Sequence, residues 1–574
     1  MSTPISRATF LKTLAALGLS AVGAKLLAPY KLSIENLSTF SSELFSGNKF
    51  ACRMLGPSKK IGHILRERGG DKNKIGSAGI DQKLQDIKRT KVTIIGGGMA
   101  GLSAAWWLQK HNLTDFIVLE LEQVVGGNST SGKNQISAYP WGAHYVPIAN
   151  SESKYVRQLF EELKIIQGYD SKGEAIYDEL MLCHQPQDRL YKDGAFHDGL
   201  VPKRGLQQNE SDEIARFFDQ MITLRHTIGS DGQPAFAIPL DLSSQDADLR
   251  ALDKISMKVW LAQNKFSSRP LLWYVDYCCK DDYGSTAQFV SAWAGIHYFA
   301  GRRGTAANSE QNAVLTWPQG NGFLVEQLKA PLSKNIQVNA LATSIKEADG
   351  KVLTTYLNTK TETYAAIESD FVIFAGPRFV ANRLIAPSIG IAGSEDKLAP
   401  PSALTYSPTY SPWMVANISL KHLPDGQGVL PAWDNVSYYS QSLGYVVANH
   451  QEITTRYKPT VITYYFPLSQ QEPKVARQAL NKASADDWSK TIVEDLEKMH
   501  PGIASEIISI DLWPWGHGMV RPSVGEIWGE SRQAMKQPLG NIFFAHSDMS
   551  GISNFEEAQY HGVEAAKMIL AKQS

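Results

Sequence analysis

A glycine-rich turn directly after an apolar segment is the feature that most restricts the fold of this 574-residue chain. Residues 91–95 read KVTII, and residues 96–101 continue as GGGMAG, with the spacing G-x-G-x-x-G. A helical pattern over residues 99–111 and a second apolar stretch over residues 116–120 follow. This order of strand, glycine turn, helix and strand predicts the opening βαβ unit of a parallel sheet.

Each glycine in this turn has a physical task. Gly96 permits the tight turn, Gly98 lets the backbone approach a pyrophosphate, and Gly101 lets the helix pack closely on the strand. Met99 and Ala100 open the helix, whose free N–H groups and partial positive charge suit phosphates. The turn therefore predicts a dinucleotide site.

An acidic residue ends the second strand, as this kind of site requires. Glu120 lies 24 residues after Gly96, where its carboxylate can accept hydrogen bonds from the adenosine ribose. A 2′-phosphate would be repelled there. The alternative is a glycine turn that only packs a βαβ unit.

Size and charge limit the remaining possibilities. The length exceeds one core, so we expect two or three domains. Lys plus Arg equals Asp plus Glu, at 57 each, and no basic cluster marks a nucleic-acid surface. We therefore expect a small-molecule partner. Cys278 and Cys279 are expected to be packing thiols rather than a redox pair.

The first 28 residues have the features of an export signal. Arg7 and Lys12 precede an apolar stretch over residues 13–24. Residues 6–12 (SRATFLK) are similar to the twin-arginine motif, with Ala8 replacing the second arginine. We expect a periplasmic or exported protein with no later membrane span. The alternatives are a cytoplasmic protein and one anchored by its N-terminus. Residues 29–87 are expected to form an arm around the main body.

A glycine pair after Glu120 extends the motif. With Gly126, Gly127 and Asn128, residues 92–128 resemble the FAD-binding opening of the flavin amine oxidase and phytoene desaturase superfamily. That family commonly has arginine where this chain has Asn128. The resemblance implies FAD as the cofactor.

Two later segments extend the resemblance, residues 317–377 and 540–548. The resemblance implies that Ala342 lies near the adenine, and that Asp548 reaches the ribityl or pyrophosphate region. A helix beginning after Ile552 and Asn554 would direct its N-terminus at the flavin pyrimidine, where its dipole stabilises the reduced flavin.

These segments predict an α/β fold in which a Rossmann-like FAD-binding domain is joined to a discontinuous α+β substrate domain. The FAD-binding domain is expected from residues 88–150, 317–380 and 509–574. The substrate domain is expected from residues 151–316, mainly helical, and 381–508.

The resemblance also places residues 139–145 and 513–518 beside the flavin. Gly142 and Ala143 would contact the cofactor, and His144 and His517 would act as acid–base or hydrogen-bonding groups. Trp515 would form an apolar or cation-binding wall. The alternatives are structural histidines and a packing tryptophan. No metal site is expected, and the acidic pair at residues 281–282 is interpreted as a solvated turn or helix cap.

Together these features predict an FAD-dependent, amine oxidase-like oxidoreductase. It would oxidise or desaturate a small organic substrate by hydride transfer to flavin N5. An NAD-linked dehydrogenase, a flavin-dependent isomerase without net redox change and a nucleotide-binding scaffold are the alternatives. The sequence does not select a substrate.

Overall fold

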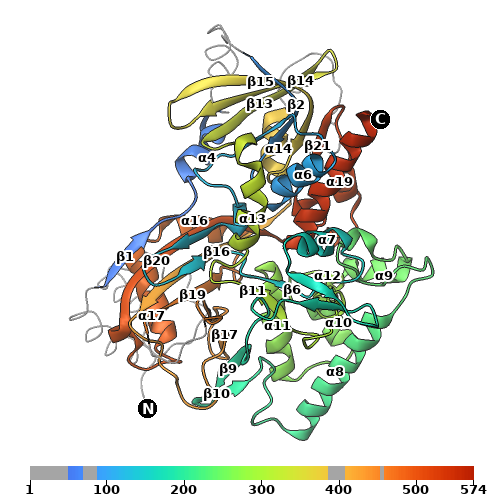
Figure 1. The fold of residues 1–574 in the computed structure, drawn as a ribbon. Helices are drawn as coiled ribbons and strands as arrows, with labels where there is room; N and C mark the ends of the chain where they lie inside the picture. Colours follow the sequence, from blue (N-terminus) through green and yellow to red (C-terminus); the bar gives the residue numbers. More distant parts are fainter. Residues whose placement is uncertain (1–49, 69–86, 386–407, 453–457, 574) are drawn as a thin grey trace.

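The computed structural model describes residues 50–68, 87–385, 408–452 and 458–573, which are built around two separate sheets (Figure 1). The expected export signal lies outside the described residues. Of the expected N-terminal arm, the described part forms strand β1 (Ala51–Met54) and helix α4 (Lys59–Arg68). Among the described residues, no helix has the length and apolarity that crossing a membrane requires.

The first sheet contains the predicted nucleotide-binding unit. Its strands β12, β3, β2, β15 and β21 run parallel. The sheet continues with β14, which is antiparallel to β15, and with β13, which is antiparallel to β14. Helix α6 connects β2 to β3, which confirms the predicted βαβ order. The elements are β2 (Lys88–Ile95), α6 (Met99–Lys110), β3 (Phe116–Leu119), β12 (Ile336–Gln337), β13 (Ala340–Ala348), β14 (Lys351–Asn358), β15 (Thr363–Phe374) and β21 (Ile542–Phe544).

The C-terminal helix α19 (Phe555–Gln573) packs directly on α6. A Cβ atom at Gly562 would lie 2.2 Å from the carbonyl oxygen of Ala100. The absence of a side chain at residue 562 therefore sets how closely α19 approaches the first turn of α6. This contact brings the end of the chain against the glycine turn.

The second sheet has eight strands, in the order β1-β20-β16-β19-β18-β17-β9-β10. Helices α16 (Pro473–Lys482) and α17 (Ala485–Leu496) pack against its β20 side. Its strands are β9 (Asp188–Lys192), β10 (Ala195–Asp198), β16 (Tyr410–Leu420), β17 (Asp434–Ser437), β18 (Tyr445–Val447), β19 (Thr460–Pro467) and β20 (Ile507–Val520), together with β1.

One predicted boundary is wrong in this sheet. The sequence predicts residues 509–520 as part of the FAD-binding domain, but they form most of β20. That strand pairs with β16 along most of its length, from Ile507 opposite Leu420 to Val520 opposite Tyr410. Of residues 509–574, β21 therefore joins the nucleotide-binding sheet, and α19 packs against that unit.

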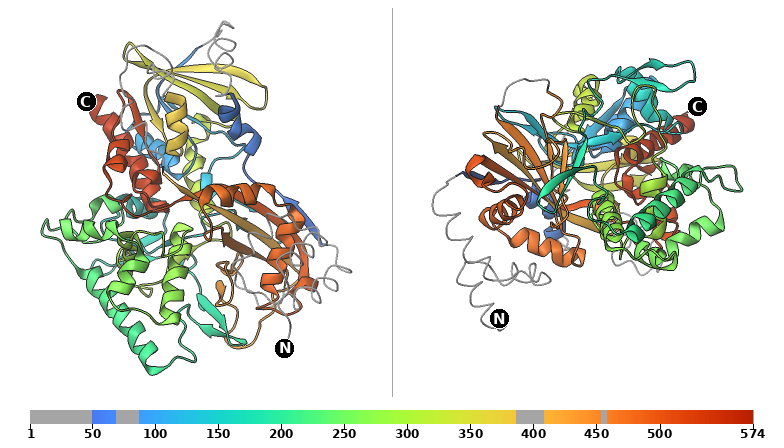
Figure 2. Two further views of the ribbon diagram at one scale, coloured as in Figure 1. Left: turned by 180° about the vertical axis from the view of Figure 1, so that it is seen from behind. Right: turned by 90° about the horizontal axis from the view of Figure 1, so that it is seen from below.

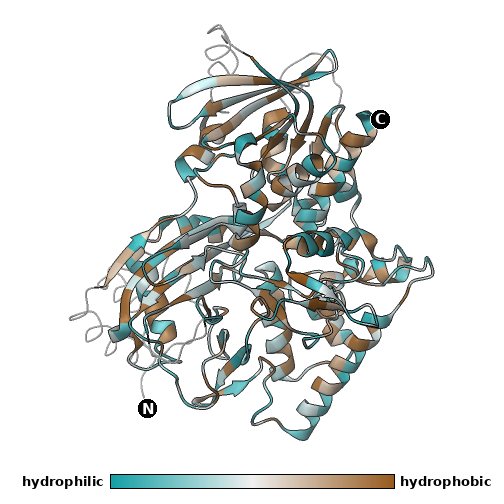
Figure 3. Cartoon of the chain, in the orientation of Figure 1, coloured by the Kyte–Doolittle hydropathy of each residue, from teal (hydrophilic) through white to brown (hydrophobic). Residues whose placement is uncertain are grey.

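Helices dominate the chain between the first two nucleotide-binding segments, as predicted for residues 151–316 (Figure 2). The longest, α8 (Gln208–His226), shows alternating hydrophobic and hydrophilic bands (Figure 3) and buries Ile214, Phe217 and Met221. Its helical neighbours are α10 (Met257–Gln263), α11 (Arg269–Tyr283) and α12 (Ala292–Ala300). The short strands β6 (Tyr145–Pro147) and β11 (Val314–Thr316) pair beside them.

The contact of α19 with α6 yields a stability prediction. Gly562→Ala should lower the free energy of unfolding by about 1–3 kcal/mol, because the methyl group forces the two helices apart. Urea unfolding followed by circular dichroism measures this. Gly62→Ala in α4 is the matched control, since no atom lies within 4 Å of its added methyl group. Equal stability of the two variants would contradict the proposed close packing.

Candidate dinucleotide site and adjoining hollow

The glycine turn leaves no room for side chains at its start. Gly96 has a φ of +108°, and its N–H donates to the Leu119 carbonyl at 2.8 Å. A Cβ atom at Gly101 would lie 1.9 Å from the carbonyl oxygen of Gly96. The backbone of the first helical turn is thus pressed against the end of β2, as the sequence predicts.

The turn is open at Gly98, in contrast to Gly96 and Gly101. The nearest atom to a Cβ added at Gly98 is the Cα of Gly127, 3.9 Å away. No side chain caps the N-terminus of α6 at this residue. Space above free helical N–H groups fits a pyrophosphate, which needs both close backbone approach and hydrogen-bond donors. Met99 and Ala100 form the buried start of that helix.

Glu120 is held at the edge of this space. Its two carboxylate oxygens accept hydrogen bonds from the backbone N–H groups of Gly97 and Glu122, both at 2.8 Å. Burial raises the pKa of Glu120 to about 7. Its own carbonyl accepts from the N–H of Ala340, so the start of β13, with the buried Ala342, lies next to it. Ala342 therefore lies two residues along β13 from the residue that bonds to Glu120.

The glycine pair connects the turn to the next predicted segment. Gly126 has a φ of +134°, and its N–H donates to the Gly97 carbonyl at 2.8 Å. The Asn128 carbonyl accepts from the N–H of Ala143 at 2.9 Å, and a Cβ at Gly142 would lie 2.4 Å from the same oxygen. Backbone hydrogen bonds therefore link the glycine turn, the glycine pair and the segment at Gly142 and Ala143.

Asn128, which stands in place of an arginine, has a structural role in this chain. Its side-chain Nδ2 donates a hydrogen bond to the carbonyl of Gly518 on β20. Beside this contact, Trp515 donates from Nε1 to the Trp141 carbonyl at 2.6 Å. Trp141 stacks on Trp513, with ring centroids 4.5 Å apart. Trp515 therefore lies in an aromatic wall next to Gly142.

The two predicted histidines lie in different environments. His144 stacks on Tyr465 at 4.5 Å, and burial lowers its pKa to about 4, so the imidazole is neutral at pH 7. His517 is more exposed and contacts the rings of Phe379 and Tyr410, 4.8 and 5.7 Å away, but partial burial lowers its pKa to about 4 as well. Both imidazoles are therefore neutral at pH 7, His144 beside the Gly142 carbonyl and His517 beside Phe379.

Asp548 lies where the two sheets meet. Its carboxylate accepts from the backbone N–H of Arg378 at 2.8 Å and from the hydroxyl of Tyr410 on β16. Burial opposes its charge, but His546, at 2.9 Å, and these hydrogen bonds lower its pKa. The carboxylate is thus ionised and held between β15, β16 and β21.

The predicted helix start is confirmed. The side-chain oxygen of Asn554 accepts from the N–H of Glu557 at 2.8 Å and caps α19. The hydroxyl of Ser553 accepts from the N–H of Val520, which ties this turn to the end of β20. Ile552 is 2% exposed and packs in the core of the helical part.

The interpretation of Asp281 and Asp282 as a solvated turn or helix cap is wrong. Both residues lie inside α11, and burial raises the pKa of both carboxyls, that of Asp281 to about 7. Arg302 donates to Asp282 at 2.7 Å and to the hydroxyl of Tyr145 at 3.3 Å. No local sequence signal indicates this enclosure, because Arg302 and Tyr145 come from distant parts of the chain. Cys278 and Cys279 are buried in the same helix, as expected for packing thiols.

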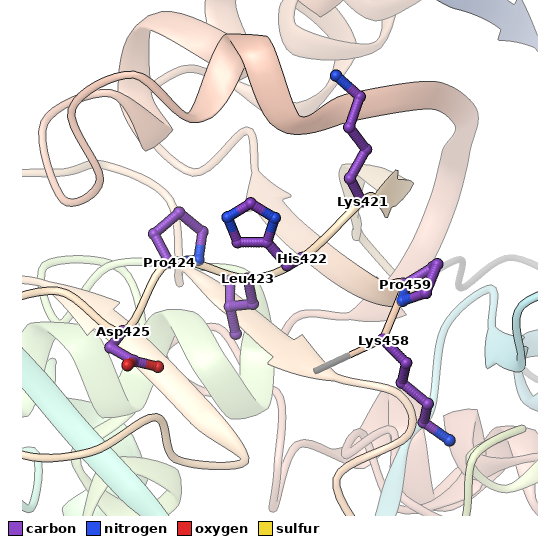
Figure 4. Close-up of a pocket in the computed structure, with 7 residues that line it drawn as sticks. All are labelled: Lys421, His422, Leu423, Pro424, Asp425, Lys458 and Pro459. Atoms are coloured by element: carbon purple, nitrogen blue, oxygen red, sulfur yellow. The ribbon is translucent and has the colours of Figure 1, made fainter. Parts of the chain in front are cut away.

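A hollow lined by Lys421, His422 and Asp425 lies elsewhere (Figure 4). It adjoins the end of β16 opposite to Tyr410, about 33 Å along the strand at about 3.3 Å per residue. Lys421 is exposed and donates to the Ser505 carbonyl at 2.7 Å. This surface has no contact with the glycine turn.

Comparison with known proteins agrees with this geometry. Residues 94–163 match the family described as NAD(P)-binding Rossmann-like domain. Oxidoreductase PigB of Serratia sp. (strain ATCC 39006) is 24% identical over 301 residues, which cover 49% of this chain and 41% of that protein. The match thus spans less than half of the relative's length.

Solved structures show the same overall fold. Putrescine oxidase bound to putrescine superposes with a TM-score of 0.61 at 16% identity, covering 85% of this chain and all of that one. Cyclohexylamine oxidase from Brevibacterium oxydans IH-35A gives 0.58 at 13% identity, with coverages of 84% and 99%. A fatty acid isomerase from P. acnes gives 0.55 at 16% identity, with coverages of 83% and 98%. The chain therefore has the flavin amine oxidase fold, with a Rossmann-like nucleotide-binding domain.

The open space at Gly98 separates folding from nucleotide binding. Gly98→Val should fold normally, because residue 98 has an ordinary φ of −75° and free space around its Cβ, but it should lose the nucleotide. Gly101→Val should fail to fold, because its side chain collides with the backbone of Gly96. Thermal unfolding and flavin absorbance of the two purified proteins test this. A Gly98→Val protein as yellow as the wild type would contradict the assignment.

Burial of Glu120 predicts a pH dependence for nucleotide affinity. Its pKa of about 7 means that the carboxyl is mostly protonated below pH 7 in the free protein. Because the carboxylate is the form that accepts both ribose hydroxyls, the Kd for FAD should rise as pH falls from 8 to 6, by up to about tenfold per pH unit below the pKa. Fluorescence titration of free FAD measures this. In Glu120→Gln the affinity should be lower and independent of pH over this range.

Proposed function

We propose that this protein is an FAD-dependent oxidoreductase that oxidises or desaturates a small organic substrate. The observation that carries the proposal is the open space at Gly98, with Glu120 at its edge. The flavin amine oxidase fold supports the same assignment. FAD, when bound, would accept a hydride from the substrate at its flavin N5.

The chain's own residues would hold the cofactor along a path between the two sheets. The backbone at Gly98 and the N-terminus of α6 would bind the pyrophosphate, and Glu120 would accept from the adenosine ribose. Ionised Asp548 would accept hydrogen bonds in the ribityl or pyrophosphate region. The N-terminus of α19, after Asn554, would favour negative charge on the flavin pyrimidine.

The aromatic wall would exclude water from the reacting face. Trp515 and Trp141 are fixed to each other by a hydrogen bond, so the wall is rigid where it meets Gly142. His144 is neutral at pH 7 and would donate or accept one hydrogen bond with the substrate. His517 is exposed beside Phe379, so it would hydrogen-bond only a substrate group that lies near Asp548.

An isomerase without net redox change is the second candidate, because a fatty acid isomerase shares the fold. Its product would form without oxygen consumption. An NAD-linked dehydrogenase would instead purify without a flavin spectrum, and a scaffold would hold a flavin that no donor reduces.

Anaerobic flavin bleaching tests the proposed function. Protein expressed with ample riboflavin should be yellow. When it is mixed anaerobically with a panel of amines, amino acids and prenyl compounds, at least one of them should reduce the flavin and bleach its absorbance. Air should restore the spectrum or, if not, an added quinone should. Gly98→Val, mixed with the same donors and free FAD, is the control for non-enzymatic reduction. A colourless protein that releases no flavin on denaturation would overturn the proposal.

We also propose that the protein acts after export, on the basis of the signal features of residues 1–28. The twin-arginine route carries folded proteins, which suits a protein that binds its cofactor before transport. Cell fractionation of the native strain tests this proposal. Recovery of all protein in the cytoplasm would exclude it.

A further inference from the structure

The segment that precedes the nucleotide-binding unit joins the two sheets. Strand β1 pairs parallel with β20, and Arg53 donates two hydrogen bonds to the Asp511 carboxylate, both at 2.7 Å. The N–H of Leu55 continues this pairing by donating to the Leu512 carbonyl at 2.8 Å. Helix α4 follows a few residues later and contacts β13 (Figure 1). Residues 50–68 therefore cross from the eight-stranded sheet to the nucleotide-binding sheet.

Helix α4 is fastened to the residue that supports the predicted ribose acid. The N–H and the hydroxyl of Ser58, directly before α4, donate to the two carboxylate oxygens of Glu122, both at 2.8 Å. The N–H of Glu122 donates in turn to Glu120 at 2.8 Å, and its carbonyl accepts from the N–H of Asn339 at 3.0 Å. These bonds form one chain from α4 to the carboxylate at the edge of the open space.

The second half of α4 packs beside the glycine turn and β13. Leu65 packs against the apolar cluster that contains Ile95 and Ala342. Ile95 is the residue before the glycine turn, and Ala342 lies on β13, the strand that α4 contacts. Helix α4 therefore borders the backbone at which the family resemblance places the adenine.

His63 extends this border toward the other predicted contact of the cofactor. It lies close enough to His517 to interact with it electrostatically, and the charge of Asp548 acts on His517 as well. Asp548 is the residue predicted to reach the ribityl or pyrophosphate region. Ser58 and His63 are about 7.5 Å apart along the helix, at about 1.5 Å per residue. The helix therefore passes from the Glu120 side of the site to the Asp548 side.

The charge of α4 suits a ligand that contains phosphate. Residues 59–65 include Lys59, Lys60 and His63 and no acidic residue. Asn128, which stands where the related family commonly has arginine, carries no charge and is bonded to the Gly518 carbonyl. Helix α4 therefore brings positive charge to a site whose own loop lacks it, and such charge attracts an anionic ligand.

We propose that α4 is part of the dinucleotide site: it covers the adenosine half of the cofactor, and Ser58 is a positioning residue that orients Glu120 through Glu122. This rests on the proposed function, because the adenosine half is that of FAD. Without the bonds of Ser58, the loop that carries Glu122 loses its attachment to α4. The N–H that fixes one oxygen of Glu120 then moves with this loop, and only the bond from Gly97 holds the carboxylate in place.

The rate of FAD release from the holoenzyme, followed by flavin fluorescence, tests the role of Ser58. Ser58→Ala should release FAD about 3- to 10-fold faster than the wild type, as expected when a hydrogen bond to a charged group is lost. Ser58→Thr should restore the wild-type rate, because it keeps both donors. A release rate of Ser58→Ala that equals the wild-type rate, or is slower, would overturn the proposal.

Ser267 provides the matched control. Its N–H and its hydroxyl donate to the two carboxylate oxygens of Glu213 at 2.8 and 3.4 Å, the same pair of contacts that Ser58 makes. Both residues lie in the helical part, Glu213 on α8 and Ser267 before α11. Ser267→Ala should release FAD like the wild type. Equally accelerated release from both serine variants would show a general loss of stability and would overturn the assignment.

The two halves of the cofactor separate a local effect from a general one. ADP contains the adenosine, and FMN contains the flavin with its ribityl chain. In calorimetric titrations of the flavin-free protein, Ser58→Ala should bind ADP about 3- to 10-fold more weakly than the wild type, and FMN equally well. Equal weakening for ADP and FMN would overturn the positioning role. If Ser58→Ala does not fold, Glu122→Gln takes its place, because it keeps the shape of the side chain and weakens the acceptor.

Trypsin tests whether α4 covers the ligand. Lys60 is exposed in the first turn of α4, and Lys258 is exposed in the first turn of α10. With ADP at about ten times its Kd, cleavage after Lys60 should slow about tenfold, because the ligand binds only the closed form of the helix. Cleavage after Lys258 should keep its rate. Equal cleavage after Lys60 with and without ADP would exclude a covering role.

The two proposals fail in different ways. A yellow holoenzyme that a donor bleaches, but whose FAD release does not depend on Ser58, would retain the proposed function and exclude the role of α4. A colourless protein would exclude the proposed function. ADP titration of that protein and of its Ser58→Ala variant would still decide whether α4 covers an adenosine.

Discussion

Close contact between backbone segments at the glycine turn is the constraint on which the rest of the structure depends. Gly101 permits the carbonyl of Gly96 to lie where any side chain would sit, and Gly562 permits α19 to rest on Ala100. Two segments separated by more than 450 residues thus meet at one helical turn. The start of α19 can lie near the nucleotide site only because neither contact carries a side chain.

A second constraint couples this unit to the eight-stranded sheet. Asn128 bonds to the Gly518 carbonyl, and Tyr410 bonds to Asp548, so β20 and β16 are attached to the nucleotide-binding sheet at two points. Asn417 adds a third by donating to the Pro140 carbonyl at 2.9 Å. Polar contacts of this kind fix distance and orientation more strictly than apolar packing. The aromatic wall between the two sheets is held by these same attachments.

The parts that could be predicted from the sequence are those whose cause is local. The turn at residues 96–101 and the start of α19 after Asn554 follow from conformational demands within a few residues, and the structure has both. The domain predicted for β20 is wrong because its partner strand, β16, lies nearly a hundred residues earlier in the chain and has no local signal in β20. The prediction for Asp281 is wrong for a similar reason, because distant segments of the chain determine whether a carboxyl is solvated or enclosed.

The enclosed carboxyls also show how stability and function oppose each other in this fold. Asp281, Asp434 and Glu556 each have a pKa raised by burial, which means that folding works against their ionisation. Apolar residues of similar size would pack there without this penalty. Buried carboxyls whose pKa is raised in this way are found at functional sites more often than in cores. The hydrophobic core of the helical part, with Trp293 and Tyr283 fully buried, supplies the stability that offsets them.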